Sequence, residues 1–181
     1  KRNSDEQRAQ TRTVHGLQSG IALPKEFEEI APEFHHHAAE SLPVFDIDKV
    51  KLKLIAGSAY GRTAPVKIYS PMFYVEVKMP AGSQLQVPME YAERALYLIS
   101  GEVHIADEVI QERTMPVFAE GAEVIITAHS DAHLVLLGGA TLPEPRYIFW
   151  NFVSTSEQRI EQPKSDWKAG LFVKVPGEDE F

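Results

Sequence analysis

Residues 82–101 read GSQLQVPMEYAERALYLISG, and the spacing of a few residues within this segment guides the interpretation of the whole chain. Glycine stands at both ends. Between the glycines, Pro88, Glu90 and Arg94 lie at intervals of two and four residues. Side chains two residues apart on a strand share one face, so this spacing can direct several of them toward one interior point. Residues 94–100 are predicted to form a strand.

The spacing matches the first cupin motif, G-x5-H-x-H-x3-E-x6-G, whose ligands reach one interior metal ion. Here the ligand positions hold Pro88, Glu90 and Arg94. Proline has no side-chain donor atom, and arginine is permanently charged and cannot coordinate a cation. The second cupin motif is G-x5-P-x-G-x2-H-x3-N. Its best placement puts Ala119 and Gly121 at the P-x-G and Val124 at the histidine, which is a metal ligand in the motif. We therefore expect a cupin-shaped barrel without an interior metal, in which Glu90 and Arg94 pair with each other, or reach other polar partners or water.

Alternation of apolar and polar residues predicts strands through the middle of the chain. Val50, Leu52 and Leu54 alternate with lysines, and the same period continues over residues 73–79. Further strands are predicted at 94–100, 102–105, 115–119, 123–128, 132–137 and, as the last one, 146–152. Turn signals separate these segments, and many short strands favour a sandwich or barrel. The predicted fold class is all-β, a cupin (double-stranded β-helix or jelly-roll) barrel with a short C-terminal helix.

The predicted organisation has three parts. Residues 1–44 form a junction segment and an irregular wrap containing several prolines, residues 45–140 form the degenerate barrel, and residues 141–181 form the final strand, a helix and a tail. A short helical turn capped by Ser4 is also predicted, because Gln7 completes a capping box with it.

In the C-terminal part, Ser154 and Glu157 predict a capping box and Gly170 a helix end. Pro163 predicts a kink or two short helices. We expect at least one indole, that of Trp150 or Trp167, to be largely buried, either between barrel and helix or at the junction with a partner barrel.

The charge, the cysteine content and the lengths of the apolar runs exclude several classes of function. The chain has 181 residues, a net charge of −8 and a pI near 5.4, so direct binding to nucleic acid is not expected. It has no cysteine, which excludes thiol chemistry and disulfides. No apolar run reaches the roughly 18 residues of a membrane span, and the first residues lack the apolar core of a signal peptide. We expect a cytoplasmic protein, or a nuclear one if the source is a eukaryote.

The histidines do not form a metal motif in the sequence. His35, His36 and His37 are consecutive and predict a solvated loop, with an adventitious metal site as the alternative. His129 and His133 have the spacing of a helical zinc pair, but Ser130-Asp131 predicts a turn between two strands instead. His104 is predicted to lie on the surface.

A series of short motifs runs along the chain from residue 15 to residue 181: HGLQ (15–18), ALPK (22–25), LIAG with YG (54–57 and 60–61), SPMFY (70–74), GG (138–139), WNFVS (150–154), IEQ (160–162), DWKAG (166–170) and VPGEDEF (175–181). In these motifs and in their order the chain resembles the pirin family. Ser19-Gly20 and Pro163 depart from the family's pattern.

Pirins carry two cupin barrels, and the resemblance covers the second barrel with the junction. It implies that a metal, usually iron, is held by three histidines and a glutamate in a first barrel upstream of residue 1; a gapless placement puts Lys1 at or next to that glutamate. It also implies a quercetin-type dioxygenase, or alternatively a non-enzymatic transcriptional cofactor or regulatory binding protein. The expected partners are the N-terminal cupin barrel of the same protein and a regulatory protein. Within this chain we expect no catalytic residue and no cofactor ligand.

Overall fold

The computed structural model describes residues 9, 11, 13 and 15–172, and it divides the chain into two compact units. The larger unit comprises residues 23–145, and the smaller one combines residues 1–22 with residues 146–181. The predicted turn at Ser4 and the VPGEDEF motif lie outside the described residues. No helix in the described part of the chain is long and apolar enough to cross a membrane.

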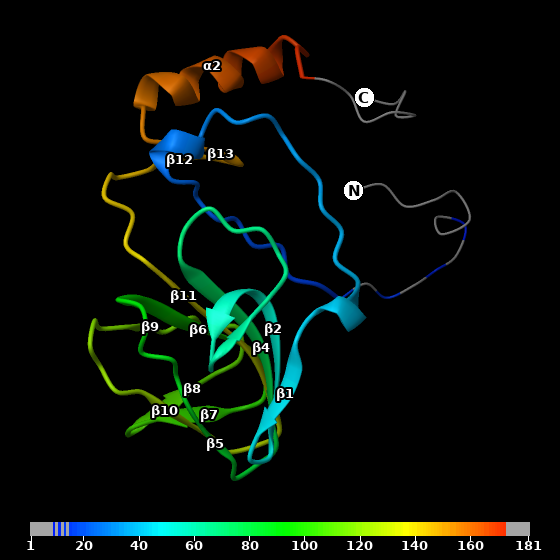
Figure 1. The fold of residues 1–181 in the computed structure, drawn as a ribbon, viewed down its shortest axis with the longest axis vertical. Coiled ribbons are helices and arrows are strands. Elements are labelled where there is room, and N and C mark those ends of the chain that lie inside the picture. The colour runs from blue at the N-terminus through cyan, green and yellow to red at the C-terminus, as the bar shows by residue number, and fades with distance from the viewer. Residues whose placement is uncertain (1–8, 10, 12, 14, 173–181) are drawn as a thin grey trace. The chain divides into compact units, whose positions relative to one another are not determined.

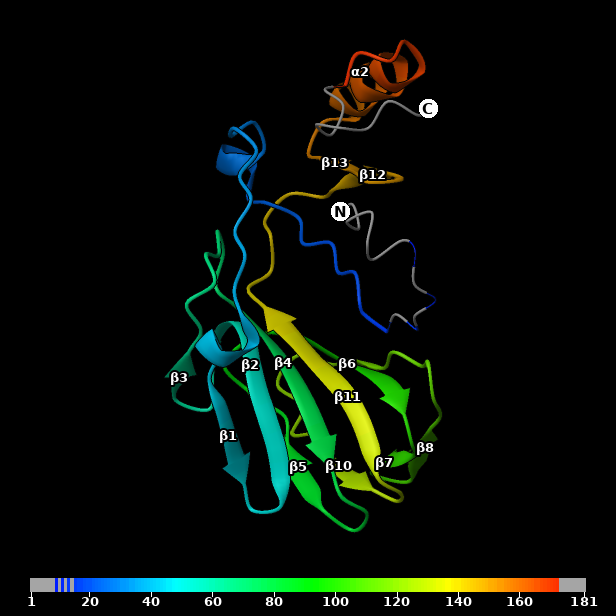
Figure 2. The ribbon, with the colours of Figure 1, turned by 90° about the vertical axis from the view of Figure 1, so that its right-hand side faces the viewer.

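A large antiparallel sheet forms one layer of the larger unit, and Figure 2 shows most of its strands side by side. Its order is β1-β2-β4-β11-β6-β9, with β3 paired to β2. The strands are β1 (Val44–Ile47), β2 (Val50–Ala59), β3 (Arg62–Thr63), β4 (Met72–Met79), β6 (Glu93–Ser100), β9 (Val117–Phe118) and β11 (Ala132–Gly139). The pairs β4–β11, β11–β6 and β6–β9 join strands that are distant in sequence, so the chain crosses repeatedly between layers, as a jelly-roll requires.

A smaller sheet forms the second layer, visible with the first in Figure 1. Its order is β5-β10-β7-β8, and its strands are β5 (Gln84–Gln86), β7 (Val103–Ile105), β8 (Glu108–Ile110) and β10 (Ile125–Ala128). Two 3-10 turns, η1 (Lys25–Phe27) and η2 (Ala39–Ser41), interrupt the irregular segment before β1. The all-β cupin fold predicted from the sequence is confirmed.

The core lies between the two sheets and follows the predicted alternation. Leu52 and Leu54 on β2, Val75 and Val77 on β4 and Leu134 on β11 are all fully buried. The small sheet contributes buried residues from each of its strands: Leu85, Val103, Ile110 and Ile126. Truncating one such leucine to alanine costs about 2–5 kcal/mol, which is a large part of the stability of a domain of this size.

The two glycines that bound the motif segment both adopt positive φ. Gly82 has φ 76° and Gly101 has φ 90°, a region that side chains other than glycine's seldom occupy. At Gly101 a Cβ atom would also lie 2.4 Å from the carbonyl oxygen of Asp131. Gly82 leads into β5 and Gly101 follows β6, so the backbone itself requires the glycines that made the motif recognisable.

The smaller unit contains a hairpin where a single strand was predicted. β12 (Tyr147–Phe149) pairs with β13 (Phe152–Ser154), and Trp150 in the turn has φ 51°. The prediction of one strand over 146–152 is therefore wrong. A run of aromatic residues favours extended structure, but it gives no signal for a tight turn when no glycine or proline marks it.

The C-terminal helix α2 (Glu157–Lys168) follows the hairpin. Its N-cap is Ser156, whose hydroxyl accepts from the Arg159 amide, so the predicted capping box at Ser154 is wrong by two residues. Pro163 does not divide the helix; its ring is buried, on the same element as the buried Ile160. Gly170 ends the helix with φ 67°, as predicted.

Neither indole is buried within the described residues, so the prediction is wrong for this chain by itself, and burial at the junction with the partner barrel stays a prediction. Trp150 is 60% exposed and Trp167 is 56% exposed, although their rings meet edge-to-face with centroids 5.0 Å apart. The helix thus contacts the hairpin through aromatic edges, and Ile160 on the same helix is only 4% exposed. Mutual contact of two large side chains at a surface covers only part of each ring.

Candidate functional site

The residues at the cupin ligand positions lie at one end of the barrel. Pro88 and Glu90 belong to the irregular segment between β5 and β6, whereas Arg94 is the second residue of β6. Val124 directly precedes β10 and is buried. Pro88 and Glu90 therefore do not share a strand face, which the motif spacing had suggested.

Arg94 is the largest fully buried side chain among the described residues, and backbone carbonyls accept hydrogen bonds from both terminal nitrogens of its guanidinium. One terminal nitrogen donates to the carbonyl oxygens of Ala122 at 2.8 Å and Ala119 at 3.1 Å, and the other donates to that of Pro88 at 3.4 Å. The Nε atom has no partner among the residues that the structure describes. Arginine presents several donors in a planar fork, so one side chain can tie the 88–93 segment to the β9–β10 turn.

The predicted pairing of Glu90 with Arg94 does not occur. Glu90 is exposed, and the described residues contain no ion pair between the two side chains. The physical reason is local: the segment around Pro88 is not a strand, so its carbonyl turns inward to the guanidinium while the glutamate turns outward. The other expectation for Arg94, that it would find polar partners, is met by the carbonyls.

Tyr60 completes the polar arrangement near Glu90. Its hydroxyl donates to the carbonyl oxygen of Gln86 at 2.7 Å. Burial raises the pKa of Tyr60, and the negative charge of Glu90 raises it further, so the phenol stays protonated at any physiological pH. It serves as a fixed donor that holds β5 to the end of β2.

These residues do not fit an interior metal ion. A cupin metal needs neutral imidazole and carboxylate ligands, whereas three of the four ligand positions hold a proline ring, the Arg94 guanidinium and the isopropyl group of Val124, and the fourth, Glu90, is exposed. The guanidinium already brings one positive charge into the space, which would repel a second cation.

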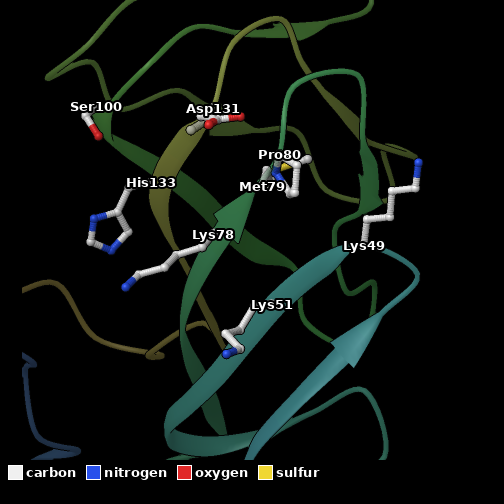
Figure 3. Close-up of a pocket in the computed structure, with 9 residues that line it drawn as sticks. Lys49, Lys51, Lys78, Met79, Pro80, Ser100, Asp131 and His133 are labelled. Carbon is white, nitrogen blue, oxygen red and sulfur yellow. The ribbon is translucent and has the colours of Figure 1, made fainter.

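The outer face of the large sheet carries a basic groove of about 390 Å³. Figure 3 shows Lys51, Lys78 and His133 on neighbouring strands, and the strand register places them directly opposite one another on β2, β4 and β11. Asp131 and Ser100 lie at one end of the groove. In the sequence each lysine is simply one polar residue of an alternating strand. Only the pairing of the strands shows that Lys51, Lys78 and His133 lie side by side.

A carboxylate organises the charges beside this groove. Glu76 lies 3.1 Å from the Lys53 ammonium and 2.9 Å from His133 Nε2. Partial burial opposes ionisation of Glu76, but the hydrogen bonds and charges of Lys53 and His133 outweigh it, so the pKa of Glu76 is lowered. His133 is therefore engaged in the sheet surface and is not part of a pair with His129.

The other predicted histidines take separate positions. His35 and His36 are exposed and His37 is half-buried, all in the irregular segment, and His35 Nε2 lies 2.9 Å from Glu33. The three consecutive imidazoles do not converge. His129 lies in the β10–β11 turn, as predicted, but it stacks on His104, which sequence reasoning treated as an isolated surface residue.

The two facing antiparallel sheets and the motif glycines define the class of protein as a cupin. The sequence family described as the pirin C-terminal cupin domain matches residues 74–173, and the chain belongs to this family. A pirin-like protein of Caulobacter vibrioides is 45% identical over 92% of this chain and 57% of its own length. A pirin-like protein of Solanum lycopersicum is 25% identical over 87% of this chain and 56% of its own length.

Solved structures show the same fold. A crystal structure of quercetin 2,3-dioxygenase from Acinetobacter baumannii superposes with a TM-score of 0.80 at 22% identity, covering 89% of this chain and 55% of that chain. The chain thus spans somewhat more than half the length of the relatives that it matches.

Proposed function

We propose that this chain is the C-terminal half of a pirin-like protein and that its own barrel binds no metal in the interior. The observation that supports this is the position of Arg94. Its guanidinium lies fully buried at the third ligand position of the motif and is held by carbonyl oxygens of two segments, Pro88 in one and Ala119 and Ala122 in the other. A permanent cation at that position is a physical obstacle to a metal ion, independent of which metal is offered.

The proposed activity of the whole protein is a metal-dependent, quercetin-type dioxygenation in an N-terminal cupin outside residues 1–181. The resemblance of the sequence motifs to pirins supports it, and so does the shared fold with a protein named quercetin 2,3-dioxygenase. Iron or another divalent metal in that N-terminal barrel would supply the oxygen chemistry. We assign no step of the reaction to residues of this chain, whose proposed role is to support the partner barrel.

Metal loading and quercetin consumption test this proposal. Residues 1–181, expressed without a tag, should not consume quercetin in air after incubation with Fe²⁺, Mn²⁺ or Co²⁺. A longer polypeptide that includes the upstream residues should consume it. Crystals of the 1–181 chain soaked in Co²⁺ should show no anomalous signal within the barrel. Quercetin consumption by the 1–181 chain, or a metal bound beside Arg94, would overturn the proposal.

A regulatory binding role is the second candidate, and the basic groove favours it. Three lysines line this groove in a protein whose net charge is −8, so its charge is opposite to that of the whole chain. An acidic partner segment would be attracted there. Fluorescein-labelled poly-glutamate should bind by fluorescence anisotropy, and Lys51→Glu combined with Lys78→Glu should abolish binding. Lys164→Glu on α2 is the control and should leave it unchanged.

A further inference from the structure

The outer face of the small sheet brings together three side chains with ligand atoms for a metal ion. Glu102 precedes β7, His104 is its central residue, and His129 lies in the turn after β10. One ligand atom from each lies within 4.8 Å of the others, and this is the one such cluster among the residues that the structure describes. We propose that Glu102, His104 and His129 form a surface site for a divalent first-row transition-metal ion.

The backbone fixes the positions from which the three side chains extend. β7 pairs antiparallel with β10, placing His104 opposite Thr127 and Val103 opposite Ala128. The His129 amide continues this pairing by donating to the Glu102 carbonyl at 2.9 Å. Glu102 lies one residue before β7 and two residues before His104, so the two side chains can share a face, and the His129 amide bonds to the Glu102 carbonyl across from it. The two strands hold these positions without any metal.

The distances between ligand atoms suit a small cation. Glu102 Oε1 lies 3.4 Å from His104 Nε2 and 3.9 Å from His129 Nε2. In a tetrahedral zinc site, with bonds of about 2.0–2.1 Å, ligand atoms are about 3.3 Å apart. The imidazole rings stack with centroids 4.9 Å apart and an interplanar angle of 14°. The His129 side chain is 69% exposed, so a small rotation brings its Nε2 into the same coordination sphere.

Neighbouring residues support Glu102 from the remaining sides. Gln111 Nε2 donates to Glu102 Oε2, the carboxylate oxygen that does not face the histidines, at 3.5 Å. The Ser130 hydroxyl accepts from the Glu102 amide at 2.9 Å, which ties the ligand strand to the turn that carries His129. Such second contacts orient ligands before a metal binds.

The chemistry of the ligands selects the class of ion. Two imidazoles with one carboxylate favour Zn²⁺, Co²⁺, Ni²⁺ or Cu²⁺ over Mg²⁺ and Ca²⁺, which prefer oxygen ligands. Three protein ligands leave at least one coordination position to water, so the ion would remain accessible at the surface. This site is separate from the barrel interior, because Val103 and Ile105 on either side of His104 pack toward the core.

Zinc titration tests the proposal in the 1–181 chain without a tag. The starting protein carries His35→Ala, His36→Ala and His37→Ala, which removes the only other histidine cluster. Calorimetry with ZnCl₂ should give one binding event per chain. His104→Ala and His129→Ala should each weaken it at least tenfold, and Glu102→Gln should weaken it less. The matched control is His133→Ala, which removes the other His–Glu contact and should change nothing.

A second measurement keeps the result independent of folding defects. Addition of Co²⁺ to the unsubstituted chain should broaden the imidazole NMR signals of His104 and His129 before that of His133. A zinc-edge anomalous peak between the two rings in crystals would locate the ion directly. No binding in the starting protein, binding unchanged by His104→Ala and His129→Ala, or broadening confined to His35–His37 would each overturn the proposal.

Discussion

Replacing Arg94 by methionine tests whether backbone carbonyls, and not Glu90, satisfy the buried guanidinium. Methionine keeps an unbranched chain but loses the charge and all donors. Hydrogen bonds to a charged group contribute about 1.5–3 kcal/mol each, so the two shorter bonds, to Ala119 and Ala122, together account for about 3–6 kcal/mol. Relief of the guanidinium's desolvation offsets part of this, and water can reach the Ala119 carbonyl in an exposed turn. We expect a net loss of about 2–4 kcal/mol in the free energy of unfolding.

Urea denaturation of Arg94→Met, Glu90→Gln and the double variant measures this loss and shows whether the two side chains interact. Glu90→Gln alone should change the free energy of unfolding by less than about 0.5 kcal/mol, as for most exposed positions. The double variant should equal the sum of the single variants within about 0.5 kcal/mol. Arg62→Met is the control: this exposed arginine lies over the Phe45 ring, a contact worth about 0.5–1 kcal/mol. A coupling energy between Glu90 and Arg94 above about 1 kcal/mol would refute the reasoning.

Three further predictions concern the scaffold. Gly101→Ala should destabilise the chain by clearly more than Gly82→Ala in thermal denaturation, because both have positive φ but only Gly101 would bring a Cβ atom against a carbonyl oxygen; equal losses would contradict this. Glu76→Gln should lower the free energy of unfolding at neutral pH. Since the folded pKa of Glu76 is depressed, that difference should be complete above the ordinary value of 4.5 and should shrink as the pH falls through the lowered pKa; a pH-independent difference would contradict it. The Glu33 carboxyl should titrate at about 2 by NMR, because His35 and Lys67 donate to it, and Lys67→Met should raise this pKa toward 4.5.

The barrel could be predicted from the sequence because its signals are local. Alternation placed Leu52, Leu54 and residues 73–79 correctly, since one face of each strand meets the core. The motif glycines were equally informative, because the positive φ at Gly82 and Gly101 is a property of single residues. The loss of metal ligands at Pro88 and Arg94 followed from their side-chain chemistry alone.

The features that sequence reasoning missed depend on register and on backbone direction. The convergence of Glu102, His104 and His129 arises only when β7 pairs with β10, because His129 is distant in sequence and lies in a turn. The partners of Arg94 are carbonyl groups, which every residue carries, so no sequence pattern marks them.

The hairpin at the aromatic segment was missed for a different reason. Its turn uses Trp150 at positive φ, where glycine or asparagine is common, so the composition pointed to a continuous strand. The exposure of the two indoles likewise followed from a contact between aromatic edges that leaves most of each ring open.

The buried guanidinium gives this barrel an internal cation that is part of the polypeptide. A metal bound by side chains exchanges with the medium, responds to chelators and oxidants, and must be supplied by the cell. Every chain carries one Arg94 as soon as it is synthesised, and the guanidinium has no redox chemistry. The assembly of the turn segments around it is therefore independent of metal supply, and the folded barrel should withstand EDTA and peroxide at concentrations that strip or oxidise a metal-loaded cupin.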